Sequence, residues 1–408
     1  SAGDVHPFVG IGLALARRGY KITLVAAGYF EQLAKNVGFD FAPIFNSDEF
    51  LALLKNPLAW HRFRGFIECF RGGVLPTFEP IYRAIADRYA SGETVVVAST
   101  LAFGARCAQE KLGLPLVTVH LSPSVFRSDY HNPVLPGMYL PHWLPAPLKR
   151  SQYWLADTLV IERLIRGPLN EFRASIGLGP VRGILAHWHH SPERVLGLFP
   201  DWFGEPQPDW PEQTVLADFP LYDERDVSPL DDQLLTFLDS GEPPLVFTPG
   251  SAMLHGREFF SAAAEACMLL GRRGILLTRF AEQVPGHLPS GVRHFPYAPF
   301  SQLLPRAAAL VHHGGIGTLS QGFAAGVPQL VMPMSFDQPD NAARLQRLGA
   351  GMAIPPKRFQ AARVAGILQR LLASRDVARR CDEIADKMEQ RRGLETACDV
   401  IEQAINIA

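Results

Sequence analysis

The stretch ALVHHGGIGTLSQGFAAGVPQLVMPMSFDQPDN, residues 309–341, decides the fold of this chain. Its apolar run ALV predicts a buried strand, the small-residue run HHGGIGT predicts a turn, and LSQGFAAG predicts a helix. The next run, GVPQLVMP, predicts a second strand that ends shortly before Asp337 and Gln338. A strand, a helix and a second strand in this order form the repeating unit of parallel α/β sheets.

The turn in this unit is suited to an anion. Its glycines lack side chains, so a phosphate can approach the backbone N–H groups at the N-terminus of the helix. His313 adds a side-chain donor beside them. Ligands of open α/β sheets bind at the C-terminal ends of strands, so we expect the turn and the Asp337–Gln338 pair to face one crevice. A carboxylate beside an amide offers both acceptors and donors to a polyhydroxyl ligand. The alternative is a tight turn followed by a surface loop, without a ligand.

The rest of the chain repeats the alternation of short apolar runs and helix-like runs. Strands are predicted at 21–27, 94–99, 115–120, 244–251, 274–280 and 292–297. A chain of 408 residues exceeds the size at which a single core keeps growing. We therefore expect an α/β protein of two Rossmann-like domains that face each other across a cleft. The expected boundaries are an N-terminal domain at 1–222, a linker at 223–242, a C-terminal domain at 243–385, and a final helix at 386–408 that crosses back to the N-terminal domain.

The composition excludes several classes of partner. The chain is 47% hydrophobic and 19% charged, with a formal net charge of −1. Nucleic acid and anionic membranes favour basic surfaces, so neither is expected as the main partner. No apolar run approaches the roughly 18 residues that a membrane-spanning helix needs. We expect a cytoplasmic protein that contacts a membrane surface loosely if at all, and the sequence does not predict its oligomeric state.

The cysteines and histidines do not predict a metal site. The five cysteines are scattered and odd in number, which is typical of reduced thiols. Three histidines, His187, His189 and His190, lie close together in HWHHSPERVLGLFP. No cysteine or acidic residue is spaced to complete a site with them, so we expect no metal there.

The first residues lack a feature that the fold requires. The chain opens on SAGDVHP, a glycine-containing loop that leads into the helix-like run PFVGIGLALARRG. In a strand–loop–helix unit an apolar strand comes first. We therefore expect roughly ten further residues upstream, or else a swapped or missing strand.

Residues 297–341 resemble the C-terminal signature of the family 1 glycosyltransferases, which have the GT-B fold. In that family an aromatic residue followed by Ala-Pro stacks on the nucleotide base, a histidine and a hydroxyl residue contact the diphosphate, and an Asp-Gln pair binds the sugar. The segment PGSA at 249–252 resembles the family's loop near the phosphates. The resemblance implies these donor-binding residues: Gly250, Ser251, Tyr297, Ala298, His313, Gly315, Gly317, Thr318, Gln321, Asp337 and Gln338.

One departure from the family pattern bears on the donor. Gln321 stands where many UDP-sugar enzymes carry a glutamate that binds both ribose hydroxyls. A 2′-deoxyribose lacks one of these hydroxyls, so the amide favours a dTDP-sugar. Further stretches, including VLGLFPDWFGEPQPDWP, resemble the bacterial rhamnosyltransferases of rhamnolipid synthesis. The resemblance therefore implies dTDP-L-rhamnose as donor, with UDP-glucose as the alternative.

The resemblance also implies a catalytic base near the start of the chain. In AGDVHPFVGIGLALARRG the residue after the glycine is the family's general base, and Asp4 holds that position. Helix N-capping ahead of Pro7 is the structural alternative for Asp4. His6 is the rival base. An aspartate that supports the base in plant members is replaced here by Ser99 and Thr100.

Two aromatic-rich segments, 46–80 and 122–145, interrupt the α/β alternation. From them we name Trp60, Phe63, Phe66 and Phe126 as candidate acceptor-binding residues. The alternative is a helix whose aromatic side chains pack on the N-terminal domain. An apolar pocket with arginine side chains at its entrance suits an amphiphilic acid, such as a hydroxy-fatty-acid lipid.

These expectations combine into an inverting transfer of a sugar from a nucleotide to a hydrophobic small molecule. The helix N-terminus and His313 are expected to balance the leaving diphosphate, so we expect no metal or other cofactor in this step. Besides the UDP-glucose alternative, two other classes fit the motifs: an inactive binding or activator protein that keeps the fold, and a sugar-nucleotide epimerase on the same fold.

Overall fold

The computed structural model describes residues 1–61, 64–135, 138, 140–141, 143–226, 228–390 and 392–405. The chain forms two compact units. One, here the C-terminal unit, contains Ser1–Pro7 and Leu221–Arg391. The other, here the N-terminal unit, contains Phe8–Pro220 and Arg392–Ala408. Residues 223–242, expected as a linker, belong to the C-terminal unit, as do the first seven residues.

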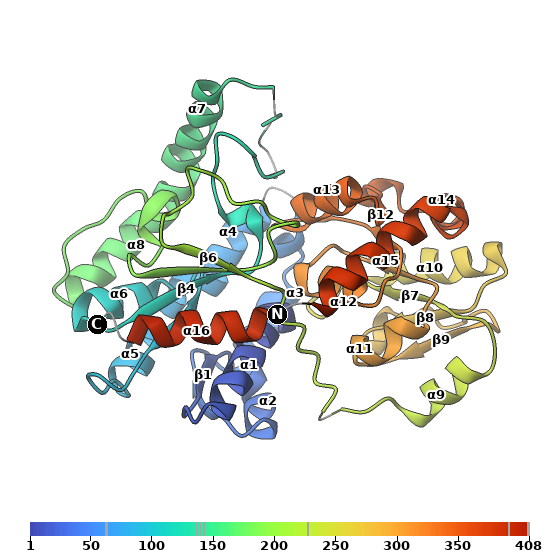
Figure 1. The fold of residues 1–408 in the computed structure, drawn as a ribbon, viewed down its shortest axis with the longest axis horizontal. Coiled ribbons are helices and arrows are strands. Elements are labelled where there is room, and N and C mark those ends of the chain that lie inside the picture. The colour runs from blue at the N-terminus through green and yellow to red at the C-terminus, as the bar shows by residue number, and fades with distance from the viewer. Residues whose placement is uncertain are drawn as a thin grey trace. The chain divides into compact units, whose positions relative to one another are not determined.

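The C-terminal unit is built on a six-stranded parallel sheet with the order β12-β11-β10-β7-β8-β9 (Figure 1). Its strands are β7 Leu245–Thr248, β8 Gly274–Leu277, β9 Val292–Phe295, β10 Ala309–His312, β11 Gln329–Val331 and β12 Gly351–Ala353. Every residue of β7, β8, β10 and β11 is buried. Helices therefore cover both faces, as expected for strands that are continuous apolar runs.

Most helices of this unit lie between its strands in the sequence, whereas α9 precedes the first strand and α14 and α15 follow the last. They are α9 Asp232–Asp239, α10 Arg257–Leu270, α11 Phe300–Leu303, α12 Ile316–Ala324, α13 Gln338–Leu348, α14 Ala361–Ala373 and α15 Arg375–Glu389. Local signals set their ends. The Asp231 carboxylate caps α9 by accepting from the N–H groups of Gln233 and Leu234 at 2.8 and 3.2 Å. Helix α10 ends at Gly271, which takes the left-handed conformation at φ 60°.

The N-terminal unit contains two parallel sheets. The smaller pairs β1 Thr23–Ala26 with β2 Asp40–Pro43. The larger has the order β3-β4-β5-β6, with β3 Val96–Ser99, β4 Leu116–His120, β5 Arg194–Leu198 and β6 Thr214–Ala217. The helices are α1 Ala2–Arg17, which belongs to this unit from Phe8 onward, α2 Glu31–Asn36, α3 Ser47–Lys55, α4 Gly65–Cys69, α5 Phe78–Ala86, α6 Phe103–Leu112, α7 Ala146–Ala156, α8 Glu162–Ser175 and α16 Gly393–Ile405.

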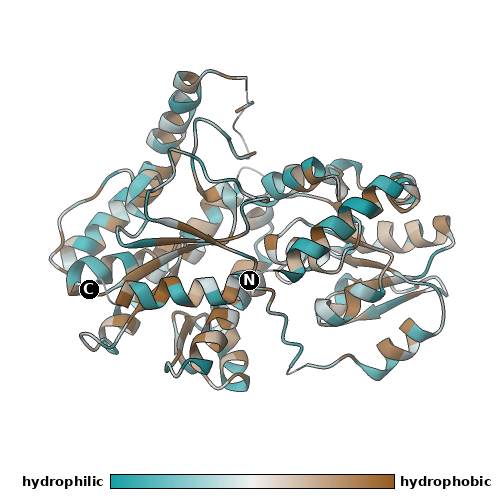
Figure 2. Cartoon of the chain, viewed as in Figure 1, coloured by the Kyte–Doolittle hydropathy of each residue, from teal (hydrophilic) through white to brown (hydrophobic). Residues whose placement is uncertain are grey.

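The last helix, α16, belongs to the N-terminal unit although it lies at the end of the sequence. Hydrophobic and polar residues alternate along α16 in Figure 2, and its apolar face packs on β4, β5 and β6. Ala397, Cys398, Val400, Ile401 and Ala404 of α16 are buried with Ile11 and Leu15 of α1. This confirms the prediction that the final helix returns to the N-terminal unit. The return occurs after Glu389, where α15 ends.

The parallel α/β architecture was predicted correctly, and some element bounds were not. The sequence prediction missed β2, β5, β6 and β12, which are only three to five residues long. Residues 2–6 were expected as a loop but lie in α1. Pro7 is inside this helix and has no N–H to donate to the preceding turn. No helix among the described residues has the length and apolarity needed to cross a bilayer.

Candidate active site

The strand order of the C-terminal unit places a switch point between β7 and β10. The chain runs from β7 outward to β9 on one side, then returns to β10 and continues to β12 on the other. Ligands of open α/β sheets bind at the carboxyl ends of the strands beside such a switch point. Gly250 and Ser251 follow β7, and His313, Gly314 and Gly315 follow β10. The predicted phosphate loop and the predicted turn are therefore neighbours.

A histidine that the sequence analysis did not single out holds the turn in shape. Gly314 takes φ 93°, which only glycine adopts without strain. Its N–H donates to Nδ1 of His312 at 3.1 Å, and Nε2 of His312 donates to Oε1 of Gln329 at 2.9 Å. His312 is fully buried, and burial lowers its pKa to about 3. The neutral ring thus acts as acceptor to the turn and donor to β11.

His313 lies between the two glycine loops. A Cβ added at Gly250 would stand 2.7 Å from Cε1 of the His313 ring, and one added at Gly315 would stand 2.4 Å from Nε2. Both glycines are therefore required by the close approach of this ring. Nδ1 of His313 is buried and has no hydrogen-bond partner among the described residues. Burial lowers the pKa of His313 to about 4, so the free ring is neutral.

The N-terminus of α12 has open space beside it. Gly315 is its N-cap, with Gly317 and Thr318 in the first turn. A Cβ added at Gly317 would meet no protein atom within 4 Å. Neither packing nor backbone conformation therefore requires a glycine here, since its φ is not positive. A ligand that approaches the free N–H groups of the first turn would require one.

Asp337 and Gln338 lie at the start of α13 and are linked to the turn by Asn341. The Asn341 amide donates to Oδ2 of Asp337 at 2.7 Å and to the carbonyl of Gly314 at 2.9 Å. Oε1 of Gln338 accepts from the N–H groups of Met334 and Ser335 at 2.8 and 3.2 Å. Its oxygen is thus used within the loop, which leaves the NH₂ group of Gln338 to a ligand. Phe336, just before them, is held at φ 56°, a conformation that is strained for a phenylalanine.

The pKa of Asp337 is near neutrality. Burial raises the pKa of this carboxyl to about 7, the hydrogen bond from Asn341 opposes the rise, and the Asp4 carboxylate adds to it. The predicted contact of sugar hydroxyls with Asp337 requires the ionised carboxylate, so donor binding would release the proton that the free protein holds below pH 7. We expect the Kd of the nucleotide sugar to rise by up to about tenfold per pH unit below 7. Titration calorimetry with the sugar nucleotide at several pH values measures this.

Two controls separate Asp337 from the rest of the site. Asp337→Asn should remove the dependence for the sugar nucleotide, and the affinity of the wild-type protein should be constant above about pH 8, where Asp337 is ionised. An unchanged pH slope in Asp337→Asn would assign the titration to another group.

Tyr297, Ala298 and Gln321 are the remaining predicted donor-binding residues of the C-terminal unit. The Tyr297 hydroxyl donates to the Asp223 carbonyl, and the Arg279 guanidinium lies 4.9 Å from the centre of its ring. Ala298 is buried and its side chain is a methyl group. Only its backbone atoms could therefore hydrogen-bond a nucleotide base. Gln321 lies in α12 and is 6% exposed. Stacking of a nucleotide base on Tyr297 stays a prediction.

Comparison with known proteins gives the family. Residues 275–402 match the family described as the Erythromycin biosynthesis protein CIII-like, C-terminal domain. The chain is 31% identical to glycosyltransferase GtfE of Amycolatopsis orientalis, over 86% of this chain and 83% of that protein. This chain belongs to the family 1 glycosyltransferases. The enzyme is also 29% identical to the O-mycaminosyltylonolide 6-deoxyallosyltransferase of Streptomyces fradiae, over 99% of this chain and 95% of that protein.

The glycosyltransferase shares the GT-B fold with solved structures. It is similar to the spinosyn rhamnosyltransferase SpnG complexed with thymidine diphosphate, with a TM-score of 0.69, 17% identity, and coverage of 98% of this chain and 97% of that chain. The two parallel α/β units of the enzyme are those of this fold.

The two candidate bases of the glycosyltransferase differ in environment. The side chain of Asp4 is 69% exposed, and the Ser1 hydroxyl donates to it at 2.7 Å. His6 is 16% exposed, and its Nε2–H donates to Oε1 of Glu224 at 2.9 Å. Arg279 also approaches Glu224, at 3.7 Å. Asp4 is thus the more accessible group, whereas His6 is held by a carboxylate that the sequence analysis did not find.

The predicted acceptor residues lie in the N-terminal unit in different settings. Trp60 ends a 3₁₀ turn and is partly exposed, and Phe66 of α4 packs against Phe70, with 4.4 Å between the ring centres. Phe63 lies outside the described residues. Phe126 is only 2% exposed and stacks on Trp210 at 4.2 Å, so protein side chains already cover its ring. The acceptor-binding role of these residues stays a prediction.

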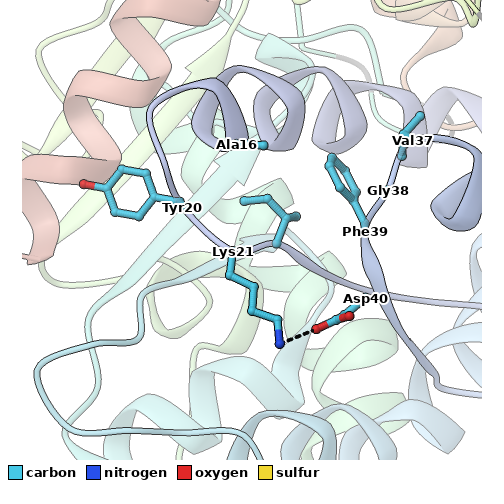
Figure 3. A pocket seen from close by; sticks show the side chains of 8 residues that line it. Ala16, Tyr20, Lys21, Val37, Gly38, Phe39 and Asp40 are labelled. Carbon is cyan, nitrogen blue, oxygen red and sulfur yellow. Dashed lines mark ion pairs between the residues drawn. The ribbon is translucent and has the colours of Figure 1, made fainter.

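A small surface pocket occurs elsewhere in the enzyme. It measures about 140 Å³ and lies at the starts of β1 and β2, where Lys21 and Asp40 form an ion pair of 2.9 Å (Figure 3). Its lining residues are Ala16, Tyr20, Lys21, Ile22, Val37, Gly38, Phe39 and Asp40. None of the predicted site residues is among them.

Proposed function

We propose that this glycosyltransferase transfers a deoxyhexose, L-rhamnose in the first instance, from its dTDP derivative to a hydroxyl of a hydrophobic small molecule, with inversion. The observation that carries the proposal is the convergence at the switch point. The open N-terminus of α12, the unpartnered Nδ1 of His313, and the Asp337–Gln338 pair belong to one turn–helix–strand–helix segment linked by Asn341. A diphosphate fits the first two and sugar hydroxyls fit the third.

In this mechanism Asp4 takes the proton of the acceptor hydroxyl as its oxygen attacks the anomeric carbon. The transition state has oxocarbenium character. Negative charge develops on the leaving diphosphate, where the N–H groups of α12 and the His313 ring donate to it. The chain supplies these donors itself, so the transfer step requires no metal.

The choice of a thymidine donor rests on Gln321 and on the relatives. Gln321 offers an amide where a carboxylate would pair with two ribose hydroxyls, and it is buried in α12. The spinosyn enzyme is described as a rhamnosyltransferase with bound thymidine diphosphate, and the Streptomyces fradiae relative as a 6-deoxyallosyltransferase. We place the enzyme in the cytoplasm, where nucleotide sugars are made, with a hydroxy-fatty-acid lipid or a similar apolar molecule as acceptor.

The donor is tested by replacing Gln321. We expect dTDP to stabilise the wild-type protein against heat more than UDP does. Gln321→Glu should shift the preference towards UDP by about tenfold, because the new carboxylate gains a charged hydrogen bond to the 2′-hydroxyl. Gln346→Glu adds the same charge at an exposed position of α13 and should leave the preference unchanged. Equal stabilisation by UDP and dTDP, with turnover of UDP-glucose, would favour the glucosyltransferase alternative.

The reaction itself is tested by pairing donors with acceptors. The protein is incubated with dTDP-L-rhamnose or UDP-glucose, together with a hydroxy-fatty acid or a flavonoid, and nucleotide release is followed. Release that depends on the acceptor supports transfer. Release without any acceptor indicates the epimerase class. Binding of dTDP without release from any pair indicates an inactive binding protein.

A further inference from the structure

Three histidines of the N-terminal unit meet at the carboxyl end of β4. His120 is the last residue of β4, and His189 and His190 follow the short π-helix Ile184–Trp188 that precedes β5. One ring nitrogen from each lies within 4.8 Å of the others. Strands β4 and β5 are neighbours in the sheet, so the fold brings His120 to the HWHH motif from 70 residues away.

Two of these rings are oriented by partners on their outer nitrogens. Nδ1–H of His120 donates to the Thr100 hydroxyl at 2.8 Å, and that hydroxyl donates in turn to the Val119 carbonyl at 3.3 Å. Nδ1–H of His189 donates to the Ile184 carbonyl at 3.1 Å. Both rings therefore carry their proton on Nδ1 and present the lone pair of Nε2. Metal-binding histidines show this arrangement, since the outer N–H is normally held by a carbonyl or a hydroxyl.

The three ring nitrogens that face one another do not carry enough protons for each of them to be hydrogen-bonded. Nε2 of His120 lies 2.9 Å from Nδ1 of His190, and one proton on Nδ1 of His190 satisfies that pair. Nε2 of His189 is buried and has no hydrogen-bond partner among the described residues. The side chain of His189 is only 3% exposed. An unpaired polar atom at this depth is destabilising.

We propose that His120, His189 and His190 bind one zinc ion through Nε2, Nε2 and Nδ1. Three imidazoles with a fourth position open to water form a known zinc ligand set, and imidazole ligands favour zinc over magnesium or calcium. Two ligands of a tetrahedral zinc ion at about 2.0–2.1 Å stand about 3.3 Å apart. Binding therefore requires the His120–His190 pair to separate by roughly 0.4 Å and the wider pairs, up to 4.8 Å apart, to approach each other. It also requires the neutral His190 ring to carry its proton on Nε2 instead of Nδ1, by exchange with solvent. The lone pair of His189 then gains a partner.

The charge around the cluster is compatible with a cation. The nearby cation is Arg127, whose guanidinium forms two hydrogen bonds to the Asp157 carboxylate at 2.5 and 2.6 Å. The Asp157 carboxylate thus neutralises the positive charge of Arg127.

The ion would also fix an aromatic residue. Phe126 stands edge-on to His120, with 4.8 Å between ring centres, and is stacked on His190 at 6.0 Å. Zinc at the histidines would tie the end of β4 to residues 184–190 beneath this ring. His189 and His190 stand out in the sequence as a histidine cluster, but His120 does not, because no sequence spacing relates a strand end to a loop 70 residues later.

The test uses the untagged full chain, stripped of metal by chelation. We expect it to take up one zinc ion per chain in competition with a chromophoric chelator, and to give the absorption bands of tetrahedral cobalt when Co²⁺ replaces zinc. His189→Gln and His190→Gln should lower zinc affinity at least about 100-fold, and Thr100→Val should lower it about 10–100-fold by freeing the outer N–H of His120. His187→Gln is the matched control, because His187 is exposed beside the cluster and should not matter.

Three results would overturn the proposal. They are no zinc uptake by the wild-type chain, zinc affinity unchanged in His189→Gln, and loss of zinc in His187→Gln, which would indicate chelation at the surface. If His189→Gln and His190→Gln fail to fold by circular dichroism, Thr100→Val and the cobalt spectrum of the wild-type protein still decide. None of these measurements depends on transferase activity.

Discussion

Replacing Asp4 with asparagine is expected to lower kcat for sugar transfer by about 10²–10⁴-fold, the contribution of a general base. Asparagine keeps the size of the side chain and can hydrogen-bond the acceptor, but it cannot take its proton. Because the Asp4 side chain is 69% exposed, the change in the free energy of unfolding should stay within about 0.5 kcal/mol. Acceptor-dependent release of dTDP measures kcat, and calorimetry with dTDP shows that the donor still binds.

The rival base gives the control. His6→Gln and Glu224→Gln each break the 2.9 Å hydrogen bond between these side chains, and each should lower kcat by less than about tenfold. The opposite pattern, an active Asp4→Asn and two inactive variants at His6 and Glu224, would make His6 the base. Glu224 would then orient its ring as the aspartate orients the histidine of a catalytic triad.

Replacing Gly317 with valine is expected to weaken dTDP binding by about 10–100-fold, since hydrogen bonds to charged groups are worth about 1.5–3 kcal/mol each. The new side chain would enter the open space at the start of α12, where no protein atom lies within 4 Å. It would hold the diphosphate away from the N–H groups without disturbing the packing. Calorimetric titration with dTDP gives the affinity.

Gly366 of α14 provides the matched substitution. A Cβ added there also meets no protein atom within 4 Å, and Gly366 also lies in a helix. Gly366→Val therefore makes the same chemical change away from the proposed ligand and should leave the dTDP affinity unaltered. Equal dTDP affinities for the wild-type protein and Gly317→Val would contradict the proposal that the diphosphate binds at the N-terminus of α12.

The sequence allowed the donor side to be predicted because its residues are close together along the chain. The turn after β10, the helix α12 and the Asp337–Gln338 pair occur in consecutive order, and their roles follow from strand and helix polarity. Asn341 was missed although it lies four residues after Asp337 on the same helix, a spacing that brings two side chains together. His312 was missed because the adjacent His313 matched the family pattern.

Contacts between distant parts of the chain could not be predicted in this way. Glu224 reaches His6 across 218 positions, and His120 reaches His190 across 70. Strands β5 and β6 were missed because their neighbours in the sheet, and not their own short runs, define them. The burial of Phe126 depends on Trp210, which no helical or strand period relates to it.

The position of α16 has a consequence for the synthesis of the protein. Residues 393–405 complete the buried cluster that contains Ile11, Leu15 and apolar residues of β4 and β5, yet they are translated after the whole of the C-terminal unit. Multidomain chains usually fold from the N-terminus as they emerge from the ribosome. Here the strands and helices of the N-terminal unit are synthesised first but cannot complete their core until α16 has been made. The C-terminal unit can therefore finish folding before the N-terminal unit does. A stalled or prematurely ended chain would therefore expose the apolar face of β4, β5 and β6 to chaperones and proteases.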